Sequence, residues 1–235
     1  MKKFELTAEF VTNVFGKKLF RIKALVAFGN VEKGELGGFI EKEDNLSHDG
    51  DAWVYGNAQV SGNARVYGNA QVSGDARVYG NAQVFGNARV YGNAWVYGNA
   101  QVFGNARVYG NAQVYGNAQV SGNARVYGNA QVSGDAWVFG NAQVFGNARV
   151  YGNAQVSDDA DYAVVKGFGR CFRTTTFFRC KDKILRVQCG CFYGDLAQFR
   201  EIVKKTHGDS KYAKEYLAIA DLMELHFSDE CGGEQ

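Results

Sequence analysis

A single six-residue unit repeats without interruption through the middle of this chain. It reads Ala-x-Val-(Tyr/Ser/Phe)-Gly-(Asn/Asp) and runs from Ala52 to Asp159, giving 18 hexads with Ala first and Val third in every one. A fixed period of this kind indicates a solenoid, because one unit is too short to bury its apolar side chains alone and stacked units bury them together. The repeat constrains the possible fold more than any other feature of the sequence.

Each hexad has the pattern of a short strand followed by a corner. Side chains alternate across a strand, so Ala and Val share the inner face while x and the aromatic residue share the outer face. Gly-Asn follows, and both residues are expected to accept the positive φ that a sharp corner needs. Three hexads close one triangular coil, and 18 hexads make six coils, which span about 29 Å at the usual strand spacing.

This pattern resembles the left-handed parallel β-helix of hexapeptide-repeat proteins, which carry an aliphatic residue at one inward position and a small residue two positions before it. We therefore expect an all-β solenoid of this class with about six regular coils over residues 52–159. The strict spacing of six excludes a solenoid of five-residue repeats. A right-handed β-helix tolerates longer and irregular coils, and nothing irregular interrupts residues 52–157.

The N-terminal part of the chain is not repetitive and is predicted to cover the open strand edge of the solenoid. Residues 1–37 form this β cap, with strands at 4–6 and 19–28 and a turn between them. Residues 38–51 form an irregular first coil, in which Gly38-Phe39-Ile40 takes the place of Ala-x-Val. Ile40 lies two residues too far from Val54 for regular hexads, so a shift of register is expected near 43–46.

Residues 160–235 are predicted to form a C-terminal cap of one β-hairpin and two helices. The hairpin strands span 172–179 and 184–191. The first helix follows the N-cap Asp195 and ends at Gly208, and the second follows Asp209 or Ser210. Three apolar sets are expected to face the cap interior: Leu185, Val187, Cys189 and Cys191 on the second hairpin strand; Leu196, Phe199, Ile202 and Val203 on the first helix; Tyr212, Tyr216, Ile219, Ala220 and Met223 on the second helix.

The non-repetitive parts carry distinctive motifs beside the array itself. They are Leu-Phe-Arg-Ile-Lys-Ala-Leu at 19–25, Lys-Gly-Glu-Leu-Gly-Gly-Phe-Ile-Glu at 33–41, Asn-Leu-Ser at 45–47, Thr-Thr-Phe-Phe-Arg at 175–179 and Cys-Gly-Cys-Phe-Tyr-Gly at 189–194. With them, the whole chain resembles the YdcK-type hexapeptide-repeat proteins, many of which are encoded in phages and prophages. The resemblance implies this fold and a phage or prophage origin, and it implies no particular activity.

The composition favours a cytoplasmic protein. The net charge is +2 and is evenly spread, so no segment is basic enough to indicate nucleic-acid binding by itself. A signal peptide is not expected, because Glu5 and Glu9 interrupt the start and no apolar stretch follows. No apolar run reaches the length of a membrane span. The five cysteines are odd in number and all follow residue 170, which favours a reducing compartment over a disulfide framework.

The candidate catalytic and metal-binding residues lie outside the regular coils. Acyltransferases with left-handed β-helices use a histidine near a subunit interface, because a base must deprotonate the acceptor. His48, in the irregular coil, is the only weak candidate here, since His207 and His226 fall in the C-terminal cap. We expect no enzymatic activity and no cofactor. A metal site is not expected either. The four cysteines that could form one lack paired Cys-x-x-Cys spacing: Cys171, Cys180, Cys189 and Cys191. Cys189 and Cys191 are better explained as buried thiols, because they fall on the apolar face of a predicted strand.

One outward face is the strongest candidate for binding. Residues 18 apart stack on the same face, and this places three arginines beside three tyrosines. We call this set the Arg–Tyr stripe: Arg89, Tyr91, Arg107, Tyr109, Arg125 and Tyr127. Guanidinium groups about 4.8 Å apart repel one another, so they would favour an anion. The rings could make cation–π contacts or stack on bases or sugars. The alternative is solvated ladder packing of Arg over Tyr.

Other outward residues bear on self-association. Trp53, Trp95 and Trp137 lie 42 residues apart. This is seven hexads, so each falls on a different face, which favours a scaffold or spacer over a decorated site. Ice binding is not expected, because it requires outward Thr ladders. Ladders of outward aromatic residues predict an interface, with a homotrimer as the favoured form.

Together these features predict a non-enzymatic scaffold or binding protein of phage or prophage type that acts through the solenoid surface. Its partner would be an unidentified protein or an anion, with no membrane. The first alternative is an anti-host factor that captures a nucleotide, a nucleic acid or a host protein on the Arg–Tyr stripe. The second, less favoured alternative is a hexapeptide-type acyltransferase.

Overall fold

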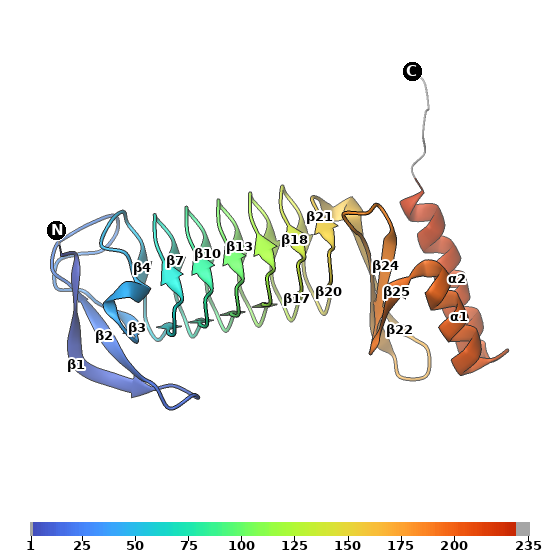
Figure 1. Ribbon diagram of the computed structural model, residues 1–235, viewed down its shortest axis with the longest axis horizontal. Coiled ribbons are helices and arrows are strands. Elements are labelled where there is room, and N and C mark those ends of the chain that lie inside the picture. The colour runs from blue at the N-terminus through green and yellow to red at the C-terminus, as the bar shows by residue number, and fades with distance from the viewer. Residues whose placement is uncertain (1, 229–235) are drawn as a thin grey trace, which may run out of the picture.

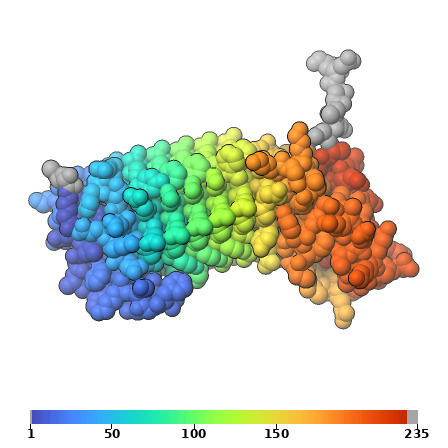
Figure 2. Space-filling view, in the orientation of Figure 1, coloured from blue at the N-terminus to red at the C-terminus, as the bar shows by residue number. Residues whose placement is uncertain are grey.

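The computed structural model describes residues 2–228 and confirms the predicted fold class. The chain forms a parallel β-solenoid of about 7 turns, followed by a C-terminal strand region and two helices. Figure 1 shows the coils stacked along one axis, with the β1–β2 hairpin at one end and the C-terminal sheet and helices at the other. In the space-filling view the coils form a rod between two wider ends (Figure 2).

The solenoid has three faces, each a sheet whose parallel strands come from successive coils. The first face contains β3 (Leu36–Ile40), β5 (Gln59–Val60), β8 (Arg77–Val78), β11 (Trp95–Val96), β14 (Gln113–Val114), β17 (Gln131–Val132) and β20 (Arg149–Val150). The second contains β4 (Trp53–Val54), β7 (Gln71–Val72), β10 (Arg89–Val90), β13 (Arg107–Val108), β16 (Arg125–Val126) and β19 (Gln143–Val144). The third contains β6 (Arg65–Val66), β9 (Gln83–Val84), β12 (Gln101–Val102), β15 (Gln119–Val120), β18 (Trp137–Val138) and β21 (Gln155–Val156).

The interior of the coils is a continuous column of Ala and Val. Every repeat Ala and Val from Ala52 to Val156 is 0% exposed, as the alternation predicts. Each hexad also donates hydrogen bonds to the next coil. Arg107 N–H, for example, donates to the Ala124 carbonyl at 2.9 Å, and Tyr109 N–H donates to the Val126 carbonyl at 3.0 Å. Apolar burial and backbone pairing therefore repeat together with each 18-residue turn.

The glycine and the asparagine at each corner have different roles. The expectation that both accept a positive φ is therefore wrong for the asparagine. The repeat glycines have positive φ, such as +70° at Gly104, while no asparagine of the described chain does. A Cβ on Gly104 would lie 3.0 Å from the Gly122 nitrogen, so the stacked corners also lack space for a side chain. The asparagines instead form ladders, in which one Nδ2 donates to the Oδ1 of the next coil, as from Asn105 to Asn123 at 3.1 Å.

The N-terminal segment extends the first face and covers its edge. Strands β1 (Phe4–Thr12) and β2 (Lys18–Ala24) form an antiparallel hairpin, and β2 pairs with β3. The first strand is longer than predicted and the second ends earlier, at Ala24. Trp53, at an outward position of the first coil, is 0% exposed because Phe4 and Phe28 pack against its ring.

The shift of register lies C-terminal to residues 43–46, where it was predicted. Ile40 pairs with Val60 and Leu46 pairs with Val66, both 20 residues apart. Trp53 pairs with Gln71 at the regular spacing of 18. The two extra residues therefore follow Leu46, while η1 (Glu43–Asn45) sits in a side of normal length. The longer corner wraps the Lys3 side chain, whose Nζ donates to the carbonyls of Gly50 and Ala52 at 3.1 and 2.9 Å.

The C-terminal region contains the predicted hairpin within a larger sheet. The antiparallel order is β22 (Tyr162–Phe168), β23 (Arg173–Arg179), β24 (Leu185–Cys189) and β25 (Phe192–Asp195). The outer two strands, β22 and β25, were not predicted. Cys189 is half-buried at the end of β24, but Cys191 lies in the following turn and is exposed, so its predicted place on the apolar face is wrong.

Side chains of this region satisfy backbone groups at the last coil, where no further coil follows. The Asp159 carboxylate, in η2 (Asp159–Asp161), accepts from Gln143 N–H at 2.9 Å. Thr176 Oγ1 accepts from Arg149 N–H at 3.1 Å. An exposed strand edge invites pairing with another chain, and these contacts occupy part of that edge.

The two helices follow the predicted boundaries closely. They are α1 (Leu196–His207) and α2 (Lys211–Phe227), capped by the Asp195 and Ser210 side chains. Their apolar faces form a second core with Phe177 and Val187 of the sheet. Two members of the predicted stripes do not reach this core: Ile202 is 37% exposed and Tyr212 is 38% exposed. No helix of residues 2–228 is long and apolar enough to cross a membrane.

Candidate binding surface

The six residues of the Arg–Tyr stripe lie side by side on the second face. Arg89 pairs in register with Arg107, and Arg107 with Arg125, along β10, β13 and β16. The rings of Tyr91 and Tyr109 are parallel within 1°, with centroids 4.8 Å apart. Tyr127 continues the stack at 4.9 Å. The tyrosine rings are therefore separated by the distance between neighbouring strands, as strand geometry predicts.

The guanidinium groups of the stripe have no acidic partner. All three arginines are exposed. Within residues 2–228, no carboxylate lies within salt-bridge distance of Arg89, Arg107 or Arg125, and none of them lies over an aromatic ring at cation–π distance. The predicted cation–π option is therefore not used within the stripe. Three like charges at successive strand positions leave a local excess of positive charge that water and counterions must screen.

The tyrosine rings are half-buried by one another. Burial raises the pKa of Tyr109, and the neighbouring hydroxyls of Tyr91 and Tyr127 raise it further, while Arg125 and Arg107 oppose the shift. The raised pKa keeps the Tyr109 phenol uncharged at neutral pH, so it adds no negative charge to the stripe. The ladders also expose less apolar surface than the sequence indicated. Of the described rings at the fourth position of the hexads, only Phe145 and Tyr151, at the C-terminal end, are exposed, at 49% and 42%.

A shallow hollow of about 220 Å³ lies at the N-terminal end of the stripe. Its lining includes Gln71 and Ser73 beside Arg89, Tyr91 and Arg107. The tyrosine column stops at Tyr91 because Ser73 has no ring to stack on it, and the missing ring leaves the hollow. Sequence reasoning did not assign Gln71 and Ser73 to the site. The sequence did contain a sign of the hollow, because a serine stands at a hexad position that is aromatic in the following coils of this face.

Arginines on the other two faces make a useful contrast. Arg77 lies over the Trp95 ring at 5.1 Å, so its guanidinium already has a cation–π partner. Arg65 and Arg149 are exposed but have no arginine at the neighbouring strand positions, since Gln83 pairs with Arg65 and Gln131 pairs with Arg149. Stacked and unpaired guanidinium groups therefore occur only on the second face of the described coils.

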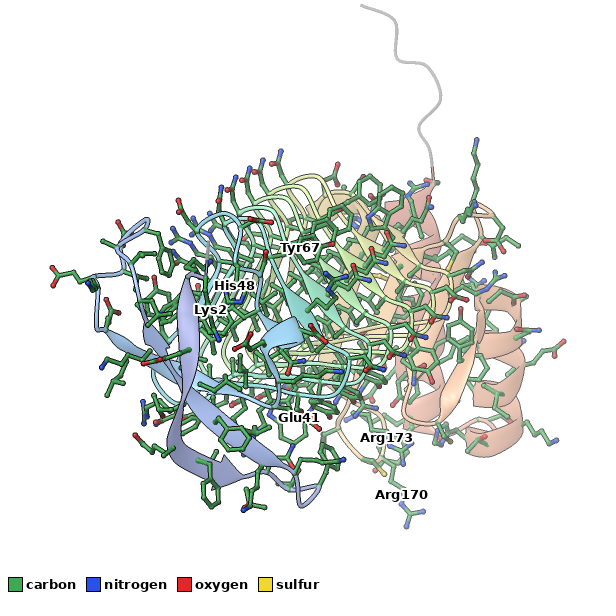
Figure 3. The ribbon with its side chains drawn as sticks, turned by 60° about the vertical axis from the view of Figure 1, so that its left-hand side comes forward. Lys2, Glu41, His48, Tyr67, Arg170 and Arg173 are labelled. Atoms are coloured by element: carbon green, nitrogen blue, oxygen red, sulfur yellow. The ribbon has the colours of Figure 1, made fainter. Side chains whose placement is uncertain are left out.

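His48, the weak candidate for a catalytic base, makes contacts that hold the N-terminal strand in place. Its Nδ1 accepts from Lys3 N–H at 3.1 Å, and its ring stacks on Phe4 with centroids 4.4 Å apart. Its Nε2 lies 3.8 Å from a Glu43 oxygen. Figure 3 shows His48 beside the N-terminal strand, near Lys2. These contacts join the irregular coil to β1, a role that the sequence did not reveal.

The four cysteines in the described part of the C-terminal region are free thiols. Cys180 is buried, and burial raises the pKa of its thiol to about 11. Cys171 and Cys191 are exposed and Cys189 is half-buried, so the predicted burial of Cys191 is wrong. Within residues 2–228, no group of three or more His, Cys, Asp or Glu side chains has metal-binding geometry.

The repeats match one known family. The family model described as YdcK beta solenoid repeat matches residues 58–71, 70–84, 82–98, 100–116, 118–134 and 142–158. The chain is a β-solenoid repeat protein. The matched segments all lie in the regular coils of the solenoid, and both ends of the chain lie outside them. No curated protein matches the chain.

Proposed function

We propose that this β-solenoid is a non-enzymatic scaffold or binding protein of phage or prophage type that works in the cytoplasm through its outer faces. The observation that carries the proposal is the second face. It combines three exposed arginines without acidic partners and a stack of tyrosines on one rigid sheet. A rigid backbone loses little conformational entropy when it binds, so a surface of this kind suits recognition without rearrangement.

The partner favoured by the stripe is an anionic chain with flat groups, and single-stranded nucleic acid has both properties. Its phosphates would contact Arg89, Arg107 and Arg125, and its bases would meet the edges of the tyrosine stack. The hollow beside Ser73 would admit one base or sugar at the end of the stripe. In a phage-infected cell, such a surface could instead take a nucleotide or an acidic host protein, which makes the chain an anti-host factor.

Self-association is a second part of the proposal. Phe145 ends the ring stack of the second face, and Tyr151 lies on the first face, where Ser133 separates it from the tyrosine stack. Both rings are exposed and offer apolar surface to a second copy. We propose a homotrimer with the solenoids side by side. Size-exclusion chromatography with light scattering measures the mass, and absorbance at two wavelengths detects bound nucleotide. A trimer without nucleotide supports a scaffold, and a monomer removes this part of the proposal.

The stripe is tested with a fluorescein-labelled oligothymidylate and fluorescence anisotropy at several salt concentrations. The triple variant Arg89→Gln, Arg107→Gln, Arg125→Gln should lose the binding while keeping the fold. Because single strands release about 0.7 counterion per neutralised phosphate, the slope of log K against log salt should fall in magnitude by about 2.

The matched control is Arg65→Gln, Arg77→Gln, Arg149→Gln, which removes the same charge from the other two faces. It should keep most of the affinity. Equal losses in the two triple variants would show that net charge, and not the stripe, binds the strand. Unchanged binding in the stripe variant would exclude the stripe as the site.

A further inference from the structure

A second cavity lies in the C-terminal region, away from the regular coils. It occupies about 360 Å³ between the β-sheet and helices α1 and α2, a size that suits a small organic molecule. Its floor is aromatic. Phe199 packs edge-on against Tyr216 with ring centroids 5.8 Å apart, and Phe192 lies 5.6 Å from Phe199 on the other side. Phe199 and Tyr216 are nearly covered, at 2% and 5% exposed, so the apolar surface that a ligand can reach belongs chiefly to Phe192 and to Ile202, which is 37% exposed.

The rim of the cavity carries positive charge. Arg170 and Arg173 line it from the segment where β22 leads into β23, and His207 lines it from the end of α1. Figure 3 shows the two arginines close together on this segment, with Arg170 extending toward solvent. Among the described residues that line the cavity, none has a carboxylate side chain.

These two arginines differ from their neighbours in lacking an acidic partner. Arg186 donates to Asp182 at 2.7 Å, and Arg200 donates to both Asp221 and Glu224 at 2.7 Å. Within residues 2–228, no carboxylate lies within salt-bridge distance of Arg170 or Arg173. The acidic groups that pair with Arg186 and Arg200 do not line the cavity. Glu215 lies beside the rim, where its carboxylate accepts from Gly169 N–H at 3.0 Å, and it pairs with neither Arg170 nor Arg173.

The cavity also explains two local features. Ile202 belongs to the predicted apolar stripe of α1, yet it is 37% exposed because it lines the cavity and not the core. Gly190 has no side chain, and a Cβ there would lie 2.2 Å from Arg173 Nη1, so the glycine leaves room for the guanidinium. Burial raises the pKa of Tyr216 to about 12, so its hydroxyl stays neutral and adds no negative charge to the floor.

We propose that this cavity binds a small aromatic anion. The anionic group contacts the guanidinium groups of Arg170 and Arg173, and the ring lies against Phe192 and Ile202. Charge-assisted hydrogen bonds to arginine supply orientation, and Phe192 and Ile202 supply the apolar contact area. This site is independent of the Arg–Tyr stripe, which lies on the second face of the coils and shares no residue with it.

The test uses 8-anilinonaphthalene-1-sulfonate, an aromatic anion that fluoresces in apolar surroundings. The full-length protein should bind one probe molecule per chain. The double variant Arg170→Gln, Arg173→Gln should bind it about ten-fold more weakly or worse, because hydrogen bonds to charged groups are lost. N-phenyl-1-naphthylamine has the same rings without the sulfonate, so its affinity should stay within about two-fold in that variant.

A second variant tests the place of binding. Ile202→Trp fills the mouth of the cavity with a partly exposed side chain, so it should block both probes while the far-UV circular dichroism stays unchanged. The stripe variant Arg89→Gln, Arg107→Gln, Arg125→Gln should bind the anionic probe as the native protein does. Equal affinity of the anionic probe for native protein and the Arg170→Gln, Arg173→Gln variant would overturn the proposal. So would loss of binding in the stripe variant.

Discussion

The regular coils and the C-terminal region bury their cores in opposite ways. The coils use only Ala and Val, each fully buried and each repeated in the next turn. The C-terminal region uses a few large side chains gathered from a sheet and two helices. The boundary runs through β23, where Phe178 belongs to the core of the coils and Phe177 belongs to the core with the helices. Alternation along one strand therefore joins the two regions and keeps their cores apart.

This difference predicts how each region responds to damage. A coil depends on its two neighbours, so the stability of the solenoid is distributed along its length. The C-terminal core depends on a small number of long-range contacts made by aromatic rings. The same kind of substitution should therefore have different consequences in the two regions, and four predictions test the comparison.

The largest effect is expected in the middle of the coils. Val102→Asp places an unpaired carboxylate in a column that is 0% exposed, which costs several kcal/mol. We expect little soluble protein and a strongly lowered Tm by circular dichroism. The control Gln101→Asp changes the adjacent, outward side chain and should alter the free energy of unfolding by about 0.5 kcal/mol or less. A native-like Tm for Val102→Asp would contradict the inward column.

The boundary in β23 is tested by two neighbouring truncations of equal size. Phe177→Ala and Phe178→Ala each remove a ring that is 0% exposed, at a cost of about 3–5 kcal/mol. Hydrogen exchange followed by mass spectrometry should show faster exchange in α1 and α2 for Phe177→Ala. For Phe178→Ala, the faster exchange should lie in the last coil, around β20 and β21. The same pattern from both variants would show one merged core.

The corners of the coils give a smaller effect. Gly104→Ala and Gly146→Ala both place a side chain at positive φ, +70° and +66°, which costs about 1–2 kcal/mol. Only Gly104 has a close neighbour, the Gly122 nitrogen at 3.0 Å from an added Cβ, whereas nothing lies within 4 Å at Gly146. Gly104→Ala should therefore lower Tm more in a thermal melt. Equal shifts would show that backbone conformation alone sets the cost.

The smallest effect concerns pH at the N-terminal end. Burial lowers the pKa of Lys3 from 10.5 to about 8, although Asp51 and Asp49 oppose the shift. Between these values the unfolded chain holds more protons than the folded one, so the free energy of unfolding rises with pH. We expect a slight rise from pH 7.5 to 9.5 in urea unfolding, and its loss in Lys3→Met.

Tyrosines should end the rise in the free energy of unfolding at higher pH. Burial raises the pKa of Tyr97 to about 12, so the folded chain keeps this proton longer than the unfolded chain. The free energy of unfolding should therefore fall as pH rises above about 10. A steady decline that begins at pH 7.5 in both the native protein and Lys3→Met would contradict the assignment to Lys3.

Much of the candidate site followed from counting residues. Arg89, Arg107 and Arg125 had to align once a coil contained 18 residues, because parallel strands in register place every eighteenth residue side by side. Counting could not show the hollow at Ser73, which depends on how the ring of Tyr91 ends its stack. It also could not show that the C-terminal arginines differ, since the pairing of Arg200 with Asp221 needs two helices in contact.

The sequence by itself determined the coils, their inward column, the alignment of the outward residues and the two capped helices. These features depend on local periodicity and on contacts that repeat at a fixed separation. Only the tertiary structure decided where the register shifts, how Lys3 and His48 hold the N-terminal strand, and which side chains end the last coil. Each of those contacts joins two residues at a sequence separation that occurs only once, so no repeating sequence pattern predicts them.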